Sequence, residues 1–164
     1  MRRKDKIIES QEELIDILRR GEICYLSMVD DGKPYVVPLN FGYWDDALFF
    51  HSAPEGRKID VLGKNPEICF TVVSHYRLAR GEKACSWTAE FRSIIGTGKA
   101  RILTGPEDKK KGLAILMGQY SDRKYDFPGI DLENVVVIRV EIETLRGKSS
   151  DAKTQGHGDT EKNR

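Results

Sequence analysis

Net charge is almost absent from this chain of 164 residues, although charged side chains are common. Lysine and arginine together number 27 and aspartate and glutamate 26, which leaves a formal charge of +1. Nucleic-acid-binding domains usually carry a clear excess or a patch of positive charge. The composition therefore argues against a nucleic-acid partner.

Long apolar runs are also missing. The run at 135–138 falls far short of the roughly 18 apolar residues that indicate a membrane span. The basic first residues are followed only by Ile7 and Ile8 before acidic side chains begin, so we expect no secretory signal. We therefore expect no membrane partner and a cytoplasmic location.

Several chemical signatures are absent as well. Cys24, Cys69 and Cys85 form no Cys-x-x-Cys pair, and the three histidines are scattered, so we expect reduced thiols and no metal site. Gly96-Thr97-Gly98 lacks the third glycine of a dinucleotide fingerprint, and no phosphate-binding Walker motif occurs. Neither a Gly-x-Ser-x-Gly elbow nor a His-Glu-x-x-His motif is present, which argues against common hydrolase and zinc-enzyme classes.

What the chain does contain is an alternation of strand and helix patterns. Ser10 can cap a helix that ends before Gly21, and further helices are predicted at 57–64 and 107–120. Strands are predicted at 23–29, 35–41, 47–52, 68–75, 89–103 and 135–145. Short connections favour antiparallel pairing, so we predict an α+β fold: a mainly antiparallel six-stranded sheet, long enough to close into a barrel, with flanking helices.

Two stretches do not fit this alternation. Residues 76–87 are polar and basic, and we expect a long loop there, either a solvated surface loop or a functional one. Residues 147–164 contain a single aliphatic side chain, Ala152, so they cannot bury enough surface to offset their ordering entropy. We expect one domain at 1–146 and a disordered tail at 147–164.

The segment 49–58 is the best candidate for a binding site. It runs from a strand through small residues to a helix start at Arg57 and Lys58, where backbone N–H groups and cations favour an anion such as a phosphate. Both cations could also be ordinary solvated helix residues. Pro38 interrupts a second strand and indicates either an edge strand or bulge, or a place where a flat ligand meets the backbone.

These segments resemble a known family. The sequences at 34–39, at 50–58 and at 91–98 are similar to the three flavin-contacting blocks of the pyridoxamine 5'-phosphate oxidase-like split barrels, with the nitroimidazole-resistance branch most similar. The resemblance extends over 7–145 and includes the helix at 107–120. It implies a split β-barrel fold, a homodimer, and FMN bound in clefts between the subunits.

The resemblance also assigns site residues. Val37, Pro38, Leu39 and Asn40 would meet the flavin ring, and Ser52, Arg57 and Lys58 would hold its phosphate. Arg92 and Ser93 would complete the site. The full set of candidates is Val37, Pro38, Leu39, Asn40, His51, Ser52, Ala53, Gly56, Arg57, Lys58, Arg92 and Ser93, with His51 as the candidate catalytic residue because an imidazole can exchange a proton near neutral pH.

One departure from the family limits the activity. The chain lacks the Arg-Leu-x-Pro ending that closes the substrate site of the vitamin B6 oxidase, so we do not expect vitamin B6 oxidation. We expect an FMN-dependent oxidoreductase that passes electrons from NAD(P)H to a small acceptor such as a nitroimidazole, with 76–87 as a candidate for substrate selection. The alternatives are a flavin- or haem-binding module without turnover, in which His51 is a possible haem ligand, and an interaction protein with a vestigial site.

Overall fold

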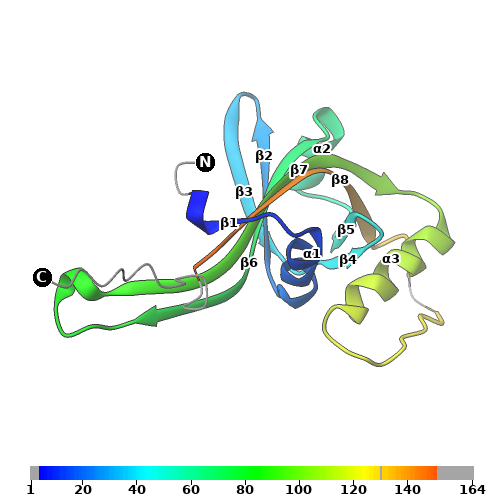
Figure 1. Cartoon of the computed structure of the whole chain (residues 1–164). Coiled ribbons are helices and arrows are strands. Elements are labelled where there is room, and N and C mark those ends of the chain that lie inside the picture. The colour runs from blue at the N-terminus through cyan, green and yellow to red at the C-terminus, as the bar shows by residue number, and fades with distance from the viewer. Residues whose placement is uncertain (1–3, 130, 151–164) are drawn as a thin grey trace, which may run out of the picture.

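The computed structural model describes residues 4–129 and 131–150 and contains one mainly antiparallel sheet flanked by helices (Figure 1). Its strands are β1 (Ile7–Ile8), β2 (Cys24–Asp30), β3 (Lys33–Leu39), β4 (Gly42–Trp44), β5 (Ala47–Ser52), β6 (Glu67–Ala79), β7 (Thr88–Leu103) and β8 (Val136–Ser149). Its helices are α1 (Gln11–Arg20), α2 (Arg57–Lys64) and α3 (Pro106–Gly118), with short 3₁₀ turns at Lys4–Lys6 and Ala84–Ser86. The predicted α+β class and the helices are confirmed.

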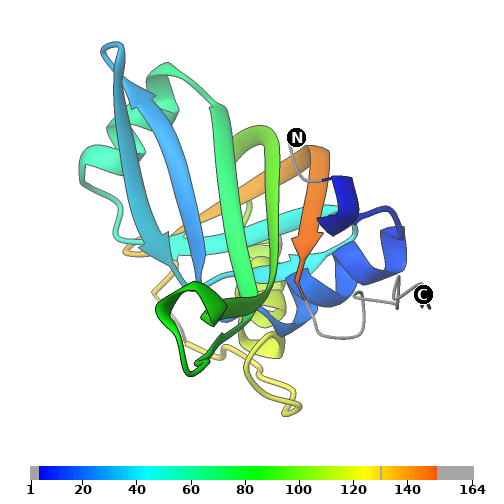
Figure 2. The same ribbon diagram turned by 60° about the vertical axis from the view of Figure 1, so that its left-hand side comes forward.

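The sheet has the strand order β3-β2-β6-β7-β8-β5-β4, and β1 pairs with the far end of β8. Figure 2 shows β2 and β3 in blue beside the long hairpin of β6 and β7 in green. Every pairing is antiparallel, and the ends of the order, β3 and β4, do not pair with each other. The arrangement is that of a split β-barrel. It has eight strands rather than six, because β1 and β4 are too short to show a period in the sequence.

The core lies between the inner face of the sheet and the helices. Along β2 and β6 buried and accessible positions alternate, so that Leu26, Phe70 and Val72 are buried while Tyr25 and Val73 are exposed. A smaller core forms where α3 packs against β5, β7 and β8. The alternation places one face of the strands against the helices and leaves the other face accessible.

The hairpin of β6 and β7 is longer than the sequence predicted. Instead of a loop at 76–87, β6 continues to Ala79 and β7 begins at Thr88, and the two strands project from the barrel as a two-stranded arm (Figure 1). A register shift between Val73 and His75 marks the base of this arm. We call residues 74–92 the arm. The loop prediction was wrong because the arm's side chains are mostly polar or exposed on both faces and give no buried strand pattern.

The boundary expected after residue 146 also needs correction. Strand β8 runs to Ser149, where Lys148 pairs with Ile7 and with Ser93, and Ser149 pairs with Arg92. Gly147 is buried, and a Cβ there would lie 2.4 Å from Leu14. Residues 147–149 therefore belong to the sheet, and the rest of the predicted tail, at 151–164, lies outside the described residues.

Within the part of the chain that the structure describes, no helix is long and apolar enough to cross a bilayer. The same residues include no group of three or more His, Cys, Asp or Glu side chains placed to hold a metal ion.

Candidate functional site

The connection between β5 and α2 forms an anion-binding geometry from the backbone upward. Gly56 precedes α2 with φ of 124°, a conformation that side chains disfavour, and gives the helix no side-chain cap. The first backbone N–H groups of the helix, at Arg57 and Lys58, therefore lack a capping oxygen. Ser52, at the end of β5, is only 6% exposed, and its Oγ has no hydrogen-bond partner among residues 4–129 and 131–150.

A buried hydroxyl without a partner is costly and uncommon in folded proteins. Ser52 lies a four-residue connection away from the uncapped start of α2, which carries two cations in its first turn. These features fit a ligand that brings negatively charged oxygen atoms. The predicted phosphate contacts are thus close along one short segment.

Arg57 is held in place by two contacts that the sequence did not reveal. Its Nε donates to Asp30 Oδ2 at 2.8 Å, and its guanidinium lies 4.3 Å from the centroid of the Tyr35 ring. Asp30 ends β2 and Tyr35 belongs to β3. The side chain is therefore preorganised beside the β2–β3 hairpin, with its terminal nitrogens left for another acceptor. Lys58 is half-buried and forms no ion pair within the described residues.

The predicted flavin-ring contacts lie on an open sheet edge. Strand β3 is the terminal strand, so one side of its backbone has no ladder partner in the described chain. Pro38 pairs with Tyr25 of β2, which confirms the edge-strand alternative for the proline. Asn40 Nδ2 donates to the Glu22 carbonyl oxygen at 3.3 Å. The open edge at Val37 and its neighbours remains accessible to a ligand.

His51 occupies the exposed face of β5 beside the buried Ser52. It pairs in register with Val137 of β8, and no hydrogen bond holds its imidazole among the residues that the structure describes. Ala53, the next residue after Ser52, is exposed too. The histidine is thus accessible to an external molecule rather than fixed in the core.

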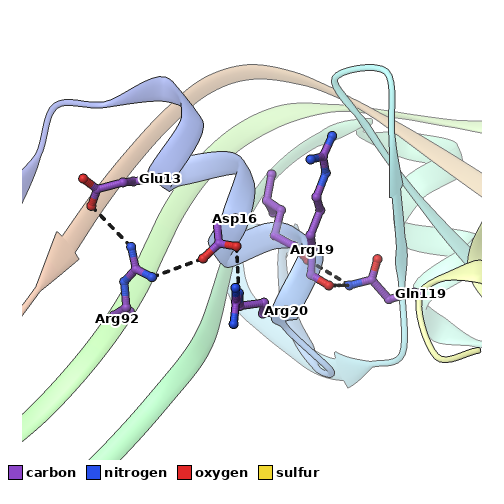
Figure 3. Close-up of polar contacts among 7 residues, drawn as sticks. Glu13, Asp16, Arg19, Arg20, Arg92 and Gln119 are labelled. Carbon is purple, nitrogen blue, oxygen red and sulfur yellow. Dashed lines mark hydrogen bonds and ion pairs between the residues drawn. The ribbon is translucent and has the colours of Figure 1, made fainter.

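Arg92 and Ser93 lie elsewhere, at the base of the arm. Figure 3 shows the Arg92 guanidinium directed at α1, where it donates to Asp16 at 3.1 Å and to Glu13 at 3.3 Å. Asp16 also accepts from Arg20 Nε at 2.7 Å, and this bond, followed by the charges of Arg20 and Arg92, lowers the pKa of Asp16. In the single chain Arg92 fastens the arm to α1.

Ser52, Arg57 and Lys58 form a first group of candidates, and Arg92 and Ser93 form a second group. Ser52 pairs with Val136 at the start of β8, whereas Ser93 pairs with Lys148 near its end. At about 3.3 Å per residue, roughly 40 Å of strand separates these two pairing positions along β8. The two groups therefore adjoin opposite ends of β8.

A cavity of about 570 Å³ lies beside the second group. It is lined by Arg20, Glu22, Ile23, Tyr25, Val73, Ser74 and Tyr76, from the end of α1, from β2 and from the arm's base. Val73 is the register partner of Ser93, and Glu22 is the residue that Asn40 contacts. The cavity is therefore lined by a residue that contacts Asn40 and by one that pairs with Ser93.

The glycines of the third sequence block have a packing role. A Cβ at Gly96 would lie 2.3 Å from the Phe70 ring, and one at Gly98 would lie 2.1 Å from the Glu141 carbonyl oxygen. A register shift between Thr97 and Gly98 bends the ladder at the same place. Glycine is required there because β7 passes too close to its neighbours for a side chain.

Asp30 and Tyr35 contact the candidate residue Arg57, and sequence reasoning did not find them. Tyr35 belongs to the first of the three sequence blocks that resemble the family. Its position two residues before Val37, on the same face of a strand, could have indicated that it lies near the site. Asp30 sits in a turn sequence, Asp30-Asp31-Gly32-Lys33, which indicates only a hairpin. Nothing in the sequence links that turn to Arg57.

Comparison with known proteins places these features in a family. The model of the family "Pyridoxamine 5'-phosphate oxidase" matches residues 10–149. No curated protein matches the chain significantly.

Among solved structures, a Bacteroides thetaiotaomicron protein provisionally named a 5-nitroimidazole antibiotic resistance protein is 32% identical, with a TM-score of 0.78 over 87% of this chain and 85% of that one. A FAD-binding protein from Mesorhizobium loti is 25% identical, with a TM-score of 0.63 over 87% and 96%. The FAD and heme binding protein from Mycobacterium smegmatis shares the fold at 18% identity, with a TM-score of 0.77 over 90% and 74%. By its sequence match, its strand order and its similarity to these structures, the chain belongs to the pyridoxamine 5'-phosphate oxidase-like family.

Proposed function

We propose that this protein is an FMN-dependent oxidoreductase that passes electrons from NAD(P)H to a small acceptor such as a nitroimidazole. The observation that carries the proposal is the buried Ser52 hydroxyl, which has no hydrogen-bond partner among the described residues and is separated by a four-residue connection from the uncapped start of α2 at Arg57 and Lys58. The names of the Bacteroides and Mesorhizobium structures support a nitroimidazole acceptor and a flavin cofactor, respectively.

The residues present fit a phosphate ester. The Ser52 hydroxyl can donate to a phosphate oxygen, as can the first N–H groups of α2, and Arg57 retains terminal nitrogens beyond its bond to Asp30. Lys58 adds a positive charge without a competing partner in the described chain. When bound, the flavin supplies the electron-transfer chemistry, and the protein supplies position and electrostatics.

The open edge of β3 can orient a planar ring. Backbone groups at 37–40 that lack a ladder partner can donate to or accept from the polar edge of a flavin. His51, exposed next to Ser52, can deliver a proton from its imidazole to a bound acceptor. This is the role we assign to His51.

A homodimer completes the proposal. The accessible face of the sheet is apolar, with Val36 55%, Ile95 56%, Tyr25 44% and Val73 44% exposed. Exposed apolar surface of this extent is typical of an interaction site. We expect a second copy packed on this face to bring its Arg92 and Ser93 towards Ser52, Arg57 and Lys58 of the first copy.

The first experiment measures cofactor binding. The absorption spectrum of the purified protein distinguishes flavin from haem, the alternative cofactor for which His51 would be an axial ligand. Arg57→Ala combined with Lys58→Ala should weaken FMN binding by about a hundredfold to ten-thousandfold, since each charge-assisted hydrogen bond contributes about 1.5–3 kcal/mol. Riboflavin, which lacks the phosphate, should lose far less.

Lys64→Ala is the matched control. Lys64 is the last residue of the same helix, at the end opposite to Arg57 and Lys58. Its Nζ lies 3.9 Å from Asp31 Oδ1. That variant should bind FMN as the wild type does. Equal losses for FMN and riboflavin would indicate a folding defect, and no loss for either would contradict the phosphate site.

The second experiment separates binding from turnover. His51→Ala should keep FMN bound and slow reoxidation by a nitroimidazole by about 10²-fold or more, the range expected for a general acid. Reduction by NAD(P)H should change much less. Stopped-flow flavin absorbance measures both half-reactions, and equal reoxidation rates would contradict the role of His51.

The third experiment tests assembly. Light scattering should give about twice the 18.6 kDa chain mass. Ile95→Glu should yield monomers with weakened FMN affinity, whereas Tyr125→Ser, which alters an exposed ring between α3 and β8, should remain dimeric. A monomeric wild type that binds FMN would contradict the shared site.

A further inference from the structure

A second cavity, unrelated to the flavin candidates, lies where the end of α1, β4 and α3 meet. Its volume is about 610 Å³, within the range of about 300–1,000 Å³ that small-molecule sites occupy. The lining comes from Arg19, Tyr43 and Trp44, and from one face of α3. None of the candidate flavin residues lines it.

The cavity is built by close backbone packing. A Cβ at Gly42, the first residue of β4, would lie 2.6 Å from the Ile115 carbonyl oxygen, so α3 rests directly on that strand. Ala114 and Gly118, one helical turn apart, give the α3 wall little side-chain bulk. A Cβ at Gly118 would meet nothing within 4 Å, so this wall is open.

Gln119 locks the three elements together. The two N–H groups of its Nε2 donate to the carbonyl oxygens of Leu18, Arg19 and Gly21 at 2.8, 3.1 and 2.9 Å, with one N–H shared between two oxygens. Its Oε1 accepts from the Tyr43 backbone N–H at 3.3 Å. Figure 3 shows this side chain turned towards the last turn of α1. Because one side chain joins α1, β4 and α3, the cavity is preformed and a ligand does not have to order it.

The chemistry of the lining specifies the ligand. Trp44 is 61% exposed beside the apolar wall of α3, so it offers a ring face for stacking. Tyr43 donates its hydroxyl to Asp46 Oδ1 at 3.2 Å, and burial together with the Asp46 charge raises the pKa of Tyr43. The phenol is therefore neutral, and its hydroxyl is already bonded to Asp46.

Two positively charged side chains line this cavity. Arg19 and Lys111 both line it, and neither forms an ion pair within residues 4–129 and 131–150. Neighbouring cations differ in this respect, since Arg20 pairs with Asp16 and Lys110 with Glu107. We propose that this cavity binds a planar aromatic molecule carrying a carboxylate or similar anionic group, with the ring against Trp44 and α3 and the anion between Arg19 and Lys111.

The test uses 2-naphthoate as the probe and 2-naphthamide as its uncharged counterpart. The background is Trp87→Phe, which removes the other tryptophan of the chain and leaves Trp44 as the fluorescent reporter. The protein is saturated with FMN if it binds FMN, and is used as purified otherwise. We expect 2-naphthoate to quench Trp44 saturably and to bind about tenfold or more tightly than the amide.

Arg19→Gln with Lys111→Gln should weaken 2-naphthoate binding by about tenfold or more and leave the amide unchanged. Arg101→Gln with Lys110→Gln is the matched control, because it removes the same charge from residues that do not line the cavity. Gly118→Leu should block both probes, whereas Gly63→Leu, at an equally open helical position in α2, should block neither. Melting temperatures of all variants establish that each is folded.

Three results would overturn the proposal: equal binding of acid and amide, retained 2-naphthoate binding in the Arg19 and Lys111 double variant, or displacement of 2-naphthoate when FMN is titrated into protein that was not first saturated with FMN. The last result would place the probe in the flavin site instead. Failure of FMN to bind would contradict the proposed function. It would not affect the test of this cavity, because the same variants are compared by the quenching of Trp44 with 2-naphthoate. The two failures are therefore distinguishable.

Discussion

The hairpin of β6 and β7 contains two regions with the same hydrogen-bonded pairing and different surroundings. In the barrel, its inward side chains are buried, with Phe70 and Ile94 each 1% exposed. In the arm, Tyr76 is 66% and Leu78 42% exposed, although their partners Phe91 and Ala89 continue the same ladder. Backbone pairing satisfies the polar groups in both regions, but only the barrel adds a buried apolar face.

This difference indicates where the arm obtains its order. A two-stranded hairpin is at best marginally stable alone in water. The arm has local contacts, among them Trp87 Nε1 donating to the Gly81 carbonyl oxygen at 2.9 Å and Arg80 5.6 Å from the centroid of the Trp87 ring. Tyr76 and Leu78 pair with Phe91 and Ala89, which share a face of β7 with Ser93 and the exposed Ile95. The homodimer proposed above would cover this face of the arm together with that of the sheet.

The largest expected effect is in the barrel. Phe70→Ala removes a ring packed against Gly96 and should destabilise the protein by about 3–5 kcal/mol, the usual cost of deleting a buried aromatic side chain. Urea denaturation followed by circular dichroism measures it. Tyr76→Ala, an aromatic deletion in the arm, is the comparison and should cost well under half as much in the monomer. Equal costs would show that the arm is packed as tightly as the barrel.

The next effect concerns the end of β8. Truncation after Arg146 removes the partners of β1 and uncovers Ile8, now 8% exposed, so it should cost about 2–3 kcal/mol, the cost of exposing a buried isoleucine plus some pairing. Truncation after Ser150 keeps these pairs and should leave the melting temperature unchanged. Identical melting temperatures for the two truncations would restore the boundary after 146 that the sequence predicted.

A smaller effect is expected where the arm meets α1. Arg92→Gln removes the ion pairs with Asp16 and Glu13 and should cost about 1–2 kcal/mol at neutral pH, because Arg92 is partly buried. The bond from Arg20, with the charges of Arg20 and Arg92, lowers the pKa of Asp16 below its ordinary value of 3.8. Its stabilising contribution is therefore present above that value and lost as pH falls through the lowered pKa.

Urea denaturation at several pH values tests this prediction. The difference between wild type and Arg92→Gln should be largest above about pH 5 and should shrink as the solution becomes more acidic than about pH 4. A difference that grows on acidification would mean that Arg92 does not stabilise the carboxylates of α1. Asp16→Asn removes the titrating carboxyl group. The stability of that variant should therefore depend less on pH in this range than that of the wild type.

The sequence predicted the elements whose side chains are buried on one face. Helix α2 and strand β5 have the predicted bounds, and Ser10 Oγ accepts from the Glu13 N–H as a helix cap should. Strands β1 and β4 were not predicted because two or three residues are too few to show a hydrophobic period. The arm was not predicted as a strand pair because strands exposed on both faces show no hydrophobic alternation.

The candidate site also has parts that the sequence could predict and parts that it could not. Ser52, Arg57 and Lys58 could be grouped from the sequence because a single turn and helix start contain them. The contacts of Arg57 with Asp30 and Tyr35 could not, because they depend on how the β2–β3 hairpin packs near α2. The separation of Ser93 from Ser52 likewise depends on strand order, which local patterns do not encode.

The smallest expected effect comes from a substitution in the arm alone. It therefore tests the comparison between the arm and the barrel most directly. Arg77 forms two hydrogen bonds with Glu90, from Nε at 2.8 Å and from a terminal nitrogen at 2.7 Å, but its side chain is 66% exposed. The Glu90 side chain is 17% exposed, but the arginine end of the pair is in solvent, so Arg77→Gln should cost about 1 kcal/mol in global stability. Hydrogen exchange should nevertheless become faster at backbone amides of the arm and stay unchanged at Phe70 and Val72, because local opening of the arm does not require the barrel to unfold. A loss of about 2 kcal/mol or more, with faster exchange in the barrel as well, would mean that arm and barrel unfold as one cooperative unit.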